Sequence, residues 1–205
     1  MKQIIHHAVY DTMADWETGH LTAHLRNGAY QPEPGRFEVV TVGPGAGPII
    51  SMGGMRVVPD MAIGDLSPRD SALLILPGAE RWDTGDDLGP FARKAREFLD
   101  AGVPVAAICG ATAGLAREGL LDDRAHTSAA PQYLQAQEGY GGSARYIEAD
   151  AVTDGDLVTA GPTEPVAFAR EVFRRLDVYP PKVLDAWYRL FAQSDASAFE
   201  VLMSA

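Results

Sequence analysis

Residues 103–112 read Val-Pro-Val-Ala-Ala-Ile-Cys-Gly-Ala-Thr, and this stretch decides the fold that we expect. Its first six residues form an apolar run with β-branched side chains, which favours a buried strand. The residues after Cys109 are small, and they favour a sharp turn followed by a helix. A strand, a tight turn at a nucleophile and a helix make up a nucleophile elbow, which needs small neighbours such as Ala107 and Ala111. The sequence therefore predicts a nucleophile elbow at Cys109.

Cys109 is the only cysteine among the 205 residues, so the chain cannot form an internal disulfide. A lone cysteine is often a small apolar residue of the core, and this interpretation competes with a catalytic one. The predicted strand, turn and helix favour a nucleophile. A helix N-terminus offers unpaired N–H groups and a positive dipole end, so we expect a lowered thiol pKa. The cysteine count and the short, polar start favour a cytoplasmic protein without a signal peptide.

Composition and charge argue against several classes of partner. The formal net charge is −11, whereas nucleic acids and anionic membranes attract basic surfaces. No apolar stretch approaches the roughly 18 residues that cross a bilayer. His20 and His24 have the spacing of a metal pair, but no third ligand follows, and residues 43–47 lack the lysine of a phosphate loop. We therefore expect no metal, no cofactor, no nucleic acid and no membrane partner.

Strand-like and helix-like segments alternate along the chain, which predicts an α/β fold with a mainly parallel sheet between two helical layers. The expected strands cover residues 4–10, 37–42, 73–76, 103–108, 126–128, 146–152 and 157–160, with a small hairpin over 49–58. The expected helices cover residues 11–27, 90–101, the segment after Cys109, and 163–176. Ligands of such sheets gather beyond the carboxyl ends of the strands, where Cys109 is placed.

The length of the chain fits one domain with an appendage. We expect a domain over residues 1–178 and a C-terminal helical extension over residues 179–205. In the extension, Val183, Leu184 and Trp187 share one helical face with Phe191. This face either packs on the same domain or forms a contact between two copies of the chain.

Glu17 is the second candidate site residue. Met13, Glu17, Leu21 and Leu25 recur every four residues, so a helix would place Glu17 on an apolar stripe. A carboxyl that faces a core needs a partner, and burial raises its pKa. A protonated carboxyl would donate a hydrogen bond to a thiolate. The spacing alone equally allows a solvated residue at the edge of the stripe.

Backbone groups and one histidine complete the candidate site. The Pro-Gly turn after residues 73–76 directs N–H groups of Gly78 and Ala79 toward the cleft, and with Gly110 these groups suit an oxyanion hole. A plain turn is the simpler interpretation. His126 is either a base for Cys109 or an ordinary half-buried histidine.

Several of these segments together resemble the ThiJ/PfpI superfamily, also called the parkinsonism-associated deglycase family, within the class I glutamine amidotransferase-like fold. The matching motifs are Asp15-Trp16-Glu17, Leu76-Pro77-Gly78-Ala79, Ala107-Ile108-Cys109-Gly110-Ala111-Thr112, Gly119-Leu120-Leu121-Asp122 and Gly161-Pro162-Thr163. They occur in order between Ile4 and Leu176. The chain is also similar to a bacterial subgroup with a His-Thr-Ser stretch, here residues 126–128, and an Asp-Ala-Trp-Tyr segment, here residues 185–188.

The resemblance implies a flavodoxin-like (Rossmann-like) three-layer sandwich, a reactive Cys109 of low pKa and a Glu17 carboxyl that touches the sulfur. It also implies a possible homodimer. Two departures matter. Gly110 stands where the intracellular-peptidase branch has a histidine, which argues against a peptidase. Alignment on residues 119–121 places Ala129 nearest the histidine of other members, so a role for His126 stays open.

We therefore expect a cysteine-dependent enzyme of the ThiJ/PfpI type that acts on a small electrophile, with Cys109 as nucleophile and Glu17 as proton donor or acceptor. The chemistry implied by the resemblance is that of a glyoxalase, deglycase, hydratase or amidase, and the fold does not choose among these. The alternative is a stress or redox sensor in which Cys109 is oxidised. A PfpI-type peptidase and a binding module with a vestigial elbow are the further alternatives.

Overall fold

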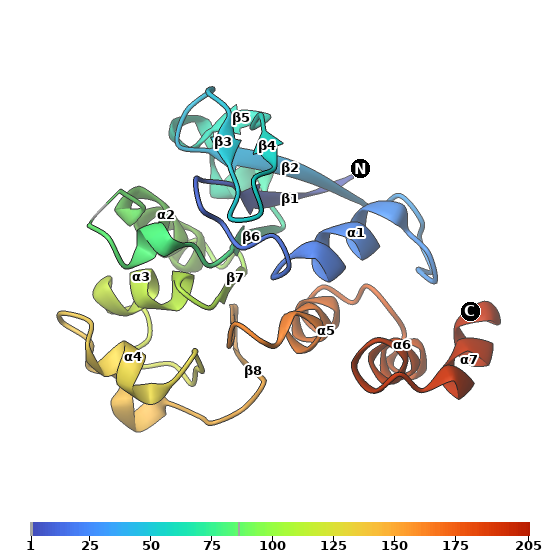
Figure 1. Cartoon of the computed structure of the whole chain (residues 1–205). Coiled ribbons are helices and arrows are strands. Elements are labelled where there is room, and N and C mark those ends of the chain that lie inside the picture. The colour runs from blue at the N-terminus through green and yellow to red at the C-terminus, as the bar shows by residue number, and fades with distance from the viewer. Residues whose placement is uncertain (1, 86) are drawn as a thin grey trace.

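The computed structural model describes residues 2–85 and 87–205. Its centre is a seven-stranded sheet in the order β5-β2-β1-β6-β7-β9-β8 (Figure 1). The strands are β1 (Gln3–Ala8), β2 (Phe37–Gly43), β5 (Met61–Ala62), β6 (Leu73–Leu76), β7 (Val105–Ile108), β8 (Ala151–Asp154) and β9 (Leu157–Ala160). Neighbouring strands run parallel, except that β8 is antiparallel to β9. Every residue of β6 and β7 is buried, as expected for central parallel strands that are covered on both faces.

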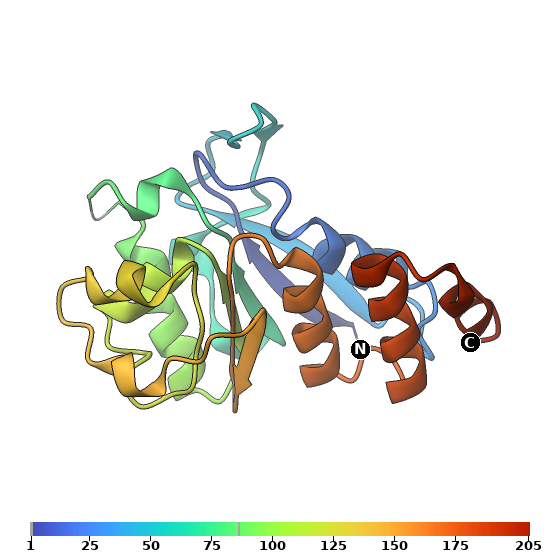
Figure 2. The same ribbon diagram turned by 60° about the horizontal axis from the view of Figure 1, so that its bottom comes forward.

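Helices cover both faces of this sheet. The helices are α1 (Gly19–Asn27), α2 (Gly89–Asp100), α3 (Ala111–Arg117), α4 (Pro131–Gln135), α5 (Pro165–Arg175), α6 (Pro181–Gln193) and α7 (Phe199–Met203). The buried apolar residues divide into two clusters, one beneath α2 and α3 and the other beneath α1, α5 and α6. Figures 1 and 2 show these two groups of helices on opposite sides of the strands. This three-layer α/β arrangement confirms the predicted flavodoxin-like fold.

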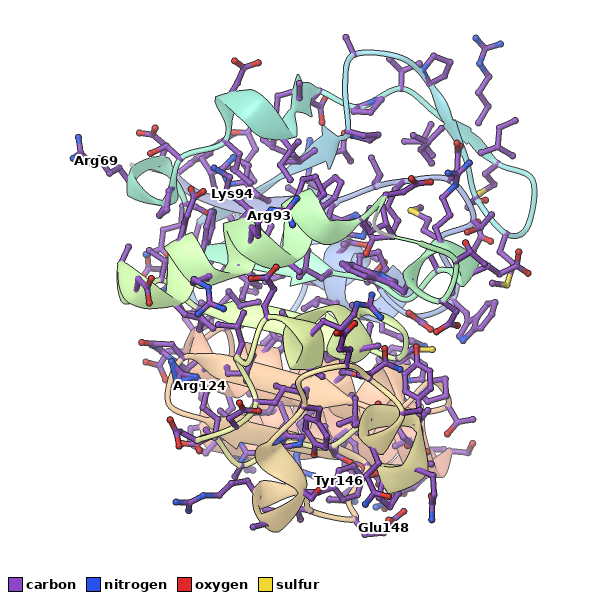
Figure 3. The ribbon with its side chains drawn as sticks, turned by 90° about the vertical axis from the view of Figure 1, so that its left-hand side faces the viewer. Arg69, Arg93, Lys94, Arg124, Tyr146 and Glu148 are labelled. Atoms are coloured by element: carbon purple, nitrogen blue, oxygen red, sulfur yellow. The ribbon has the colours of Figure 1, made fainter. Side chains whose placement is uncertain are left out.

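The outer faces carry the charged side chains. On α2, Phe91, Ala95 and Phe98 are buried against the sheet, whereas Arg93 is largely exposed and Figure 3 shows it beside Lys94 on the outside of that helix. A stripe of apolar residues on one face is the pattern that seats a helix on a sheet.

The C-terminal extension packs on the same body. In α6, Val183, Leu184 and Trp187 are buried and join the cluster that contains Phe173 of α5. The Trp187 and Phe173 rings meet edge to face at 5.0 Å. Among the described residues, no helix is both long and apolar enough to cross a membrane.

Three predicted elements differ from the structure. The first helix begins at Gly19 rather than near Asp11, because the backbone of residues 11–18 bonds to the loop after β6: the Ala14 N–H donates to the Gly78 carbonyl (2.9 Å). The strand predicted at 126–128 is a single bridge between His126 and Tyr146, and the strand predicted from 146 begins at 151. The hairpin over 49–58 is confirmed, with β3 (Ile49–Ile50) paired to β4 (Arg56–Val57).

Candidate active site

Cys109 lies between β7 and α3, at the carboxyl edge of the sheet. Its N–H donates to the Ala160 carbonyl of β9 (3.0 Å), and its own carbonyl accepts the Thr112 hydroxyl (2.6 Å). These bonds hold Cys109 at φ 57°, in the left-handed region that a residue with a Cβ rarely adopts. Such a conformation costs on the order of 1–3 kcal/mol and persists only where the surrounding structure enforces it. The side chain is half-buried.

Glu17 approaches Cys109 from the turn before α1. The residue is completely buried, and its Oε2 accepts the Gly78 N–H at 2.5 Å. Among the described residues, Oε1 has no hydrogen-bond partner, and the Cys109 side chain lies close enough to affect the pKa of the carboxyl. Burial raises the pKa of Glu17 to about 7, although the Gly78 N–H and the neighbouring Cys109 side chain act in the opposite direction. A carboxyl with such a pKa is able to accept a proton near neutral pH.

The burial of Glu17 does not have the cause that the spacing suggested. Glu17 precedes α1, so it shares no helical stripe with Leu21 and Leu25. Hydrogen bonds between residues 11–18 and the loop after β6 carry it inward. The interpretation of Glu17 as a solvated edge residue is wrong.

Position 78 requires glycine because the side chains of Cys109 and Glu17 both lie against its backbone. A Cβ at this position would lie 2.8 Å from the Cβ of Cys109 and 2.8 and 2.9 Å from the two carboxyl oxygens of Glu17. Contacts that short do not occur between real side chains, so any larger residue would separate Glu17 from Cys109. The Gly78 N–H is already donated to Glu17. This corrects its predicted role in an oxyanion hole.

The predicted lowering of the Cys109 pKa is wrong in direction. Burial and then the Glu17 carboxylate raise the pKa of Cys109 to about 12, and the Asp83 carboxylate adds to the rise. The Gly110 N–H is hydrogen-bonded to the sulfur and lowers the pKa, but burial and the two carboxylates outweigh it. Together these effects favour the thiol form of Cys109 over the thiolate.

His126 is completely buried and directed to other partners. Its Nδ1 lies 2.7 Å from the Arg124 carbonyl, and its Nε2 lies 2.7 Å from the Tyr140 hydroxyl. Its ring also meets the ring of Tyr146, which Figure 3 places on the segment that precedes β8. With both ring nitrogens engaged, His126 is a structural residue of this segment and no base for Cys109.

Three further residues lie near the cysteine or its hydrogen-bond partners, and none was predicted as a site residue. The Tyr133 hydroxyl donates to Asp83 Oδ1 (2.7 Å), and both groups interact electrostatically with Cys109. Ser128, from the His-Thr-Ser stretch, has its hydroxyl 2.6 Å from that of Thr112. Only the stretch itself could have pointed to Ser128, because Asp83 and Tyr133 stand in segments without a recognisable motif.

The histidine pair on α1 packs against aromatic rings of α6. The His20 and His24 rings stack with centroids 6.5 Å apart, and both lie against Trp187 and Phe191 of α6. Within residues 2–85 and 87–205, no group of three or more His, Cys, Asp or Glu side chains is placed to hold a metal ion.

The fold and the site define a class: a flavodoxin-like α/β protein with a strained cysteine beside a buried glutamate. Comparison with known proteins agrees, since the chain matches the DJ-1/PfpI family over residues 3–175 and belongs to that family. It is 39% identical over 199 residues to an uncharacterized protease, YoaZ, from Bacillus subtilis, covering 96% of this chain and 94% of that one. It is 29% identical over 143 residues to protein/nucleic acid deglycase 2 from Escherichia coli, covering 68% and 81%.

A solved structure is similar along nearly the whole chain. The thiJ/pfpI family protein from Bacillus anthracis superimposes with a TM-score of 0.91 at 38% identity, covering 99% of this chain and 95% of that chain. The similarity includes the C-terminal extension, because residues 1–178 alone make up less than the 99% of the chain that is covered. The family therefore accounts for the fold and allows an enzymatic function without specifying the reaction.

Proposed function

We propose that this protein is a cysteine-dependent enzyme that acts on a small electrophile, with Cys109 as nucleophile in an elbow and Glu17 as the group that moves the proton. The observation that carries the proposal is the Cys109–Glu17 pair behind Gly78. A carboxyl whose pKa is about 7 lies beside the thiol, and a Cβ at Gly78 would collide with both groups. This arrangement combines a nucleophile with a general base at neutral pH.

The proposed steps follow from the raised thiol pKa. As the sulfur attacks a carbonyl or similar carbon, an S–C bond forms and the thiol proton passes to the Glu17 carboxylate. The electron pair of the carbonyl moves to its oxygen, and protonated Glu17 returns the proton to that oxygen. The N–H of Ala79 remains a candidate for holding the oxyanion, and the N–H of Gly110 would join it by turning from the sulfur to the oxygen, whereas the N–H of Gly78 is occupied by Glu17.

The small-molecule proposal is preferred over a peptidase on steric grounds. A Cβ at Gly110 would lie 3.2 Å from both the Ala79 carbonyl and the Trp82 ring, so a histidine directly after the nucleophile would be tightly confined. A deglycase or a glyoxalase needs only a small carbonyl compound at the sulfur.

A panel assay tests the proposal. Purified protein is incubated with methylglyoxal, an alkyl isocyanide and chromogenic amides, with Cys109→Ser as the matched control. We expect turnover of at least one compound, lost in Cys109→Ser, at a rate that rises with pH through about 7 as Glu17 ionises. Turnover that persists in Cys109→Ser, or no turnover of any compound, would contradict an enzymatic role for this cysteine.

A redox sensor is the second candidate, favoured by the engagement of His126 with Arg124 and Tyr140. Without a histidine partner for catalysis, oxidation of the sulfur is the other reaction open to Cys109, although its raised pKa slows that reaction. Mild peroxide followed by peptide mass spectrometry separates the two functions. A sensor takes up oxygen at Cys109 before the six methionines and shows no turnover in the panel. Oxidation of methionines while Cys109 stays reduced would contradict a sensor function.

A further inference from the structure

We propose that the Cys109 site selects uncharged or positively charged electrophiles, and that Asp83, held in place by Tyr133, is the residue that rejects anions. The inference rests on the proposed function, since it concerns what reaches the nucleophile. It deepens that function by naming the charge class of the substrate.

Packing fixes the position of Asp83 relative to the cysteine. Asp83 follows Trp82, whose ring and Cβ lie 3.2 and 3.3 Å from the place that a Cβ would take at Gly110. The Trp82 ring also fills the space above Gly114, so this segment is seated on the first turn of α3. Asp83 is therefore held next to the residue that follows Cys109, while its side chain is exposed to solvent.

Tyr133 fixes the direction of the Asp83 side chain. The Tyr133 hydroxyl donates to Asp83 Oδ1 at 2.7 Å, and the Gln137 side chain donates to the Tyr133 carbonyl at 2.9 Å. A carboxylate on a surface loop normally samples several rotamers, and one strong hydrogen bond from a half-buried tyrosine confines it. Asp83 is close enough to Cys109 to disfavour its thiolate.

Two arginines lie near Asp83, and each has other partners. Arg81 is ion-paired with Asp87 (2.5 Å) and, more loosely, with Asp11 (3.8 Å). Arg117 begins at the far end of α3, and its guanidinium reaches back to donate to the Trp82 carbonyl, beside Asp83, and to Gln137. Among the described residues, the charged groups that raise the pKa of the thiol are Glu17 and Asp83, and both are acidic.

A cavity near the cysteine is also lined by acidic residues. It has a volume of about 320 Å³ and is bordered by Ser128 and Gly161, which adjoin the hydrogen-bond partners of Cys109. Three carboxylates line it, from Glu148, Asp150 and Glu164, and the described lining contains no lysine or arginine. Figure 3 shows Glu148 on the same segment as Tyr146. An anionic substrate near this cavity would meet negative charge in addition to that of Asp83.

The test uses three methanethiosulfonates that differ in charge: a trimethylammonioethyl cation, a neutral methyl reagent and a sulfonatoethyl anion. In each case the sulfur of Cys109 attacks the sulfenyl sulfur, a disulfide forms and methanesulfinate leaves, so one added group reports one reaction. Cys109 is the only thiol, and intact mass gives the rate directly. The ratio of cation to anion rates is independent of the thiolate fraction, because both reagents meet the same thiol.

We expect the rates to fall in the order cation, neutral reagent, anion, with a cation-to-anion ratio above about tenfold at low salt that shrinks as salt is added. Asp83→Asn should reduce this ratio by about threefold or more. The matched control is Asp100→Asn, which removes the same charge from the end of α2, at the opposite edge of the sheet. Tyr133→Phe should give an intermediate ratio, because the charge stays but is no longer confined.

Three outcomes overturn the inference. Equal rates for the three reagents would show that no charge selection exists, and an equal effect of Asp83→Asn and Asp100→Asn would assign the selection to net charge alone. A wild-type ratio in Tyr133→Phe would remove Tyr133 from the proposal. Failure of all three reagents in the folded protein, with labelling after unfolding, would instead contradict the proposed function.

Discussion

Glu17 and His24 are both ionisable; Glu17 is completely buried and His24 is half-buried, and their surroundings differ. Glu17 contacts a thiol and the N–H of a glycine that cannot be replaced, at the carboxyl edge of the sheet. His24 lies within α1 against aromatic rings, with centroid distances of 5.3 Å to Trp187 and 5.0 Å to Phe191. Burial shifts both pKa values toward the neutral form, to about 7 for Glu17 and about 4 for His24.

The comparison shows that a shifted pKa does not by itself identify a site. What distinguishes Glu17 is its neighbour: a nucleophilic atom in a strained backbone conformation, fixed against the carboxyl by a residue without a side chain. The region around His24 contains aromatic packing and no nucleophile among the residues described. The first region should therefore control reactivity, and the second should control stability.

Trp187→Ala should have the largest effect on stability and none on the site. The ring is completely buried among Phe173, His24 and Phe191, so its removal should cost about 3–5 kcal/mol of unfolding free energy. Denaturant unfolding measures the loss, and the alkylation rate of Cys109 below the transition measures the site. A loss under about 1 kcal/mol, or an altered alkylation rate, would erase the distinction between the two regions.

Glu17→Gln should change how stability depends on pH. The pKa of Glu17 is about 7 in the folded protein against an ordinary 4.5, so the folded state holds a proton that the unfolded state releases between these values. Stability of the wild type should therefore fall as pH rises from 4.5 to 7, by about 3 kcal/mol in total. Glu17→Gln does not ionise, so it avoids this loss of stability and should be more stable than the wild type at pH 8.

Urea unfolding between pH 4.5 and 8 measures this difference, with the exposed Glu138→Gln as the matched control. A constant difference between wild type and Glu17→Gln across this range would mean that Glu17 titrates as an ordinary carboxyl.

Gly78→Ala should change both the stability of the fold and the reactivity of Cys109. The new methyl group would occupy the space between Glu17 and Cys109 and should destabilise the fold by about 1–3 kcal/mol while separating the pair. Gly45→Ala is the matched control, because nothing lies within 4 Å of a Cβ at that position. Unfolding free energy and alkylation rate are measured on both variants. Equal behaviour of the two would show that Gly78 has room for a side chain.

His24→Phe should have the smallest effect, confined to acid. Because burial lowers the pKa of His24 from 6.5 to about 4, the wild type should lose stability as pH falls through this window, while the unfolded chain gains a proton. The ring is partly open to solvent, so the loss should be about 1 kcal/mol or less. The variant keeps a ring and should lose less stability in acid, as followed by thermal unfolding at pH 4 and 7. If both proteins lost the same stability between pH 7 and pH 4, the group that titrates would not be His24.

Most of the fold was predictable from the sequence because apolar runs and turn residues fixed the central strands. The runs over 73–76 and 103–108 correspond to β6 and β7, and the Gly-bounded segment over 90–101 corresponds to α2. The start of α1 was not predictable. Residues 11–18 have helical spacing, but tertiary hydrogen bonds to the loop after β6 hold them in turns.

The candidate site was also predictable only in part. The positions of Cys109, Gly78 and Glu17 followed from local pattern and family resemblance, but the direction of the Cys109 pKa shift did not. That direction depends on how completely the thiol is removed from water and on which charges face it, and both are set by contacts between distant segments. The contact of Asp83 with Tyr133 joins residues 50 positions apart and leaves no local signal.

The most direct test of the central claim, that Glu17 holds and receives the proton of Cys109, is the iodoacetamide alkylation rate of Cys109 against pH in the wild type and Glu17→Gln. We predict an inflection above the ordinary thiol value of 9.0 in the wild type. Glu17→Gln should shift it to lower pH, because a negative charge is lost and the amide can donate to the sulfur. An inflection below 9.0 in the wild type, or the same inflection in both proteins, would contradict the account.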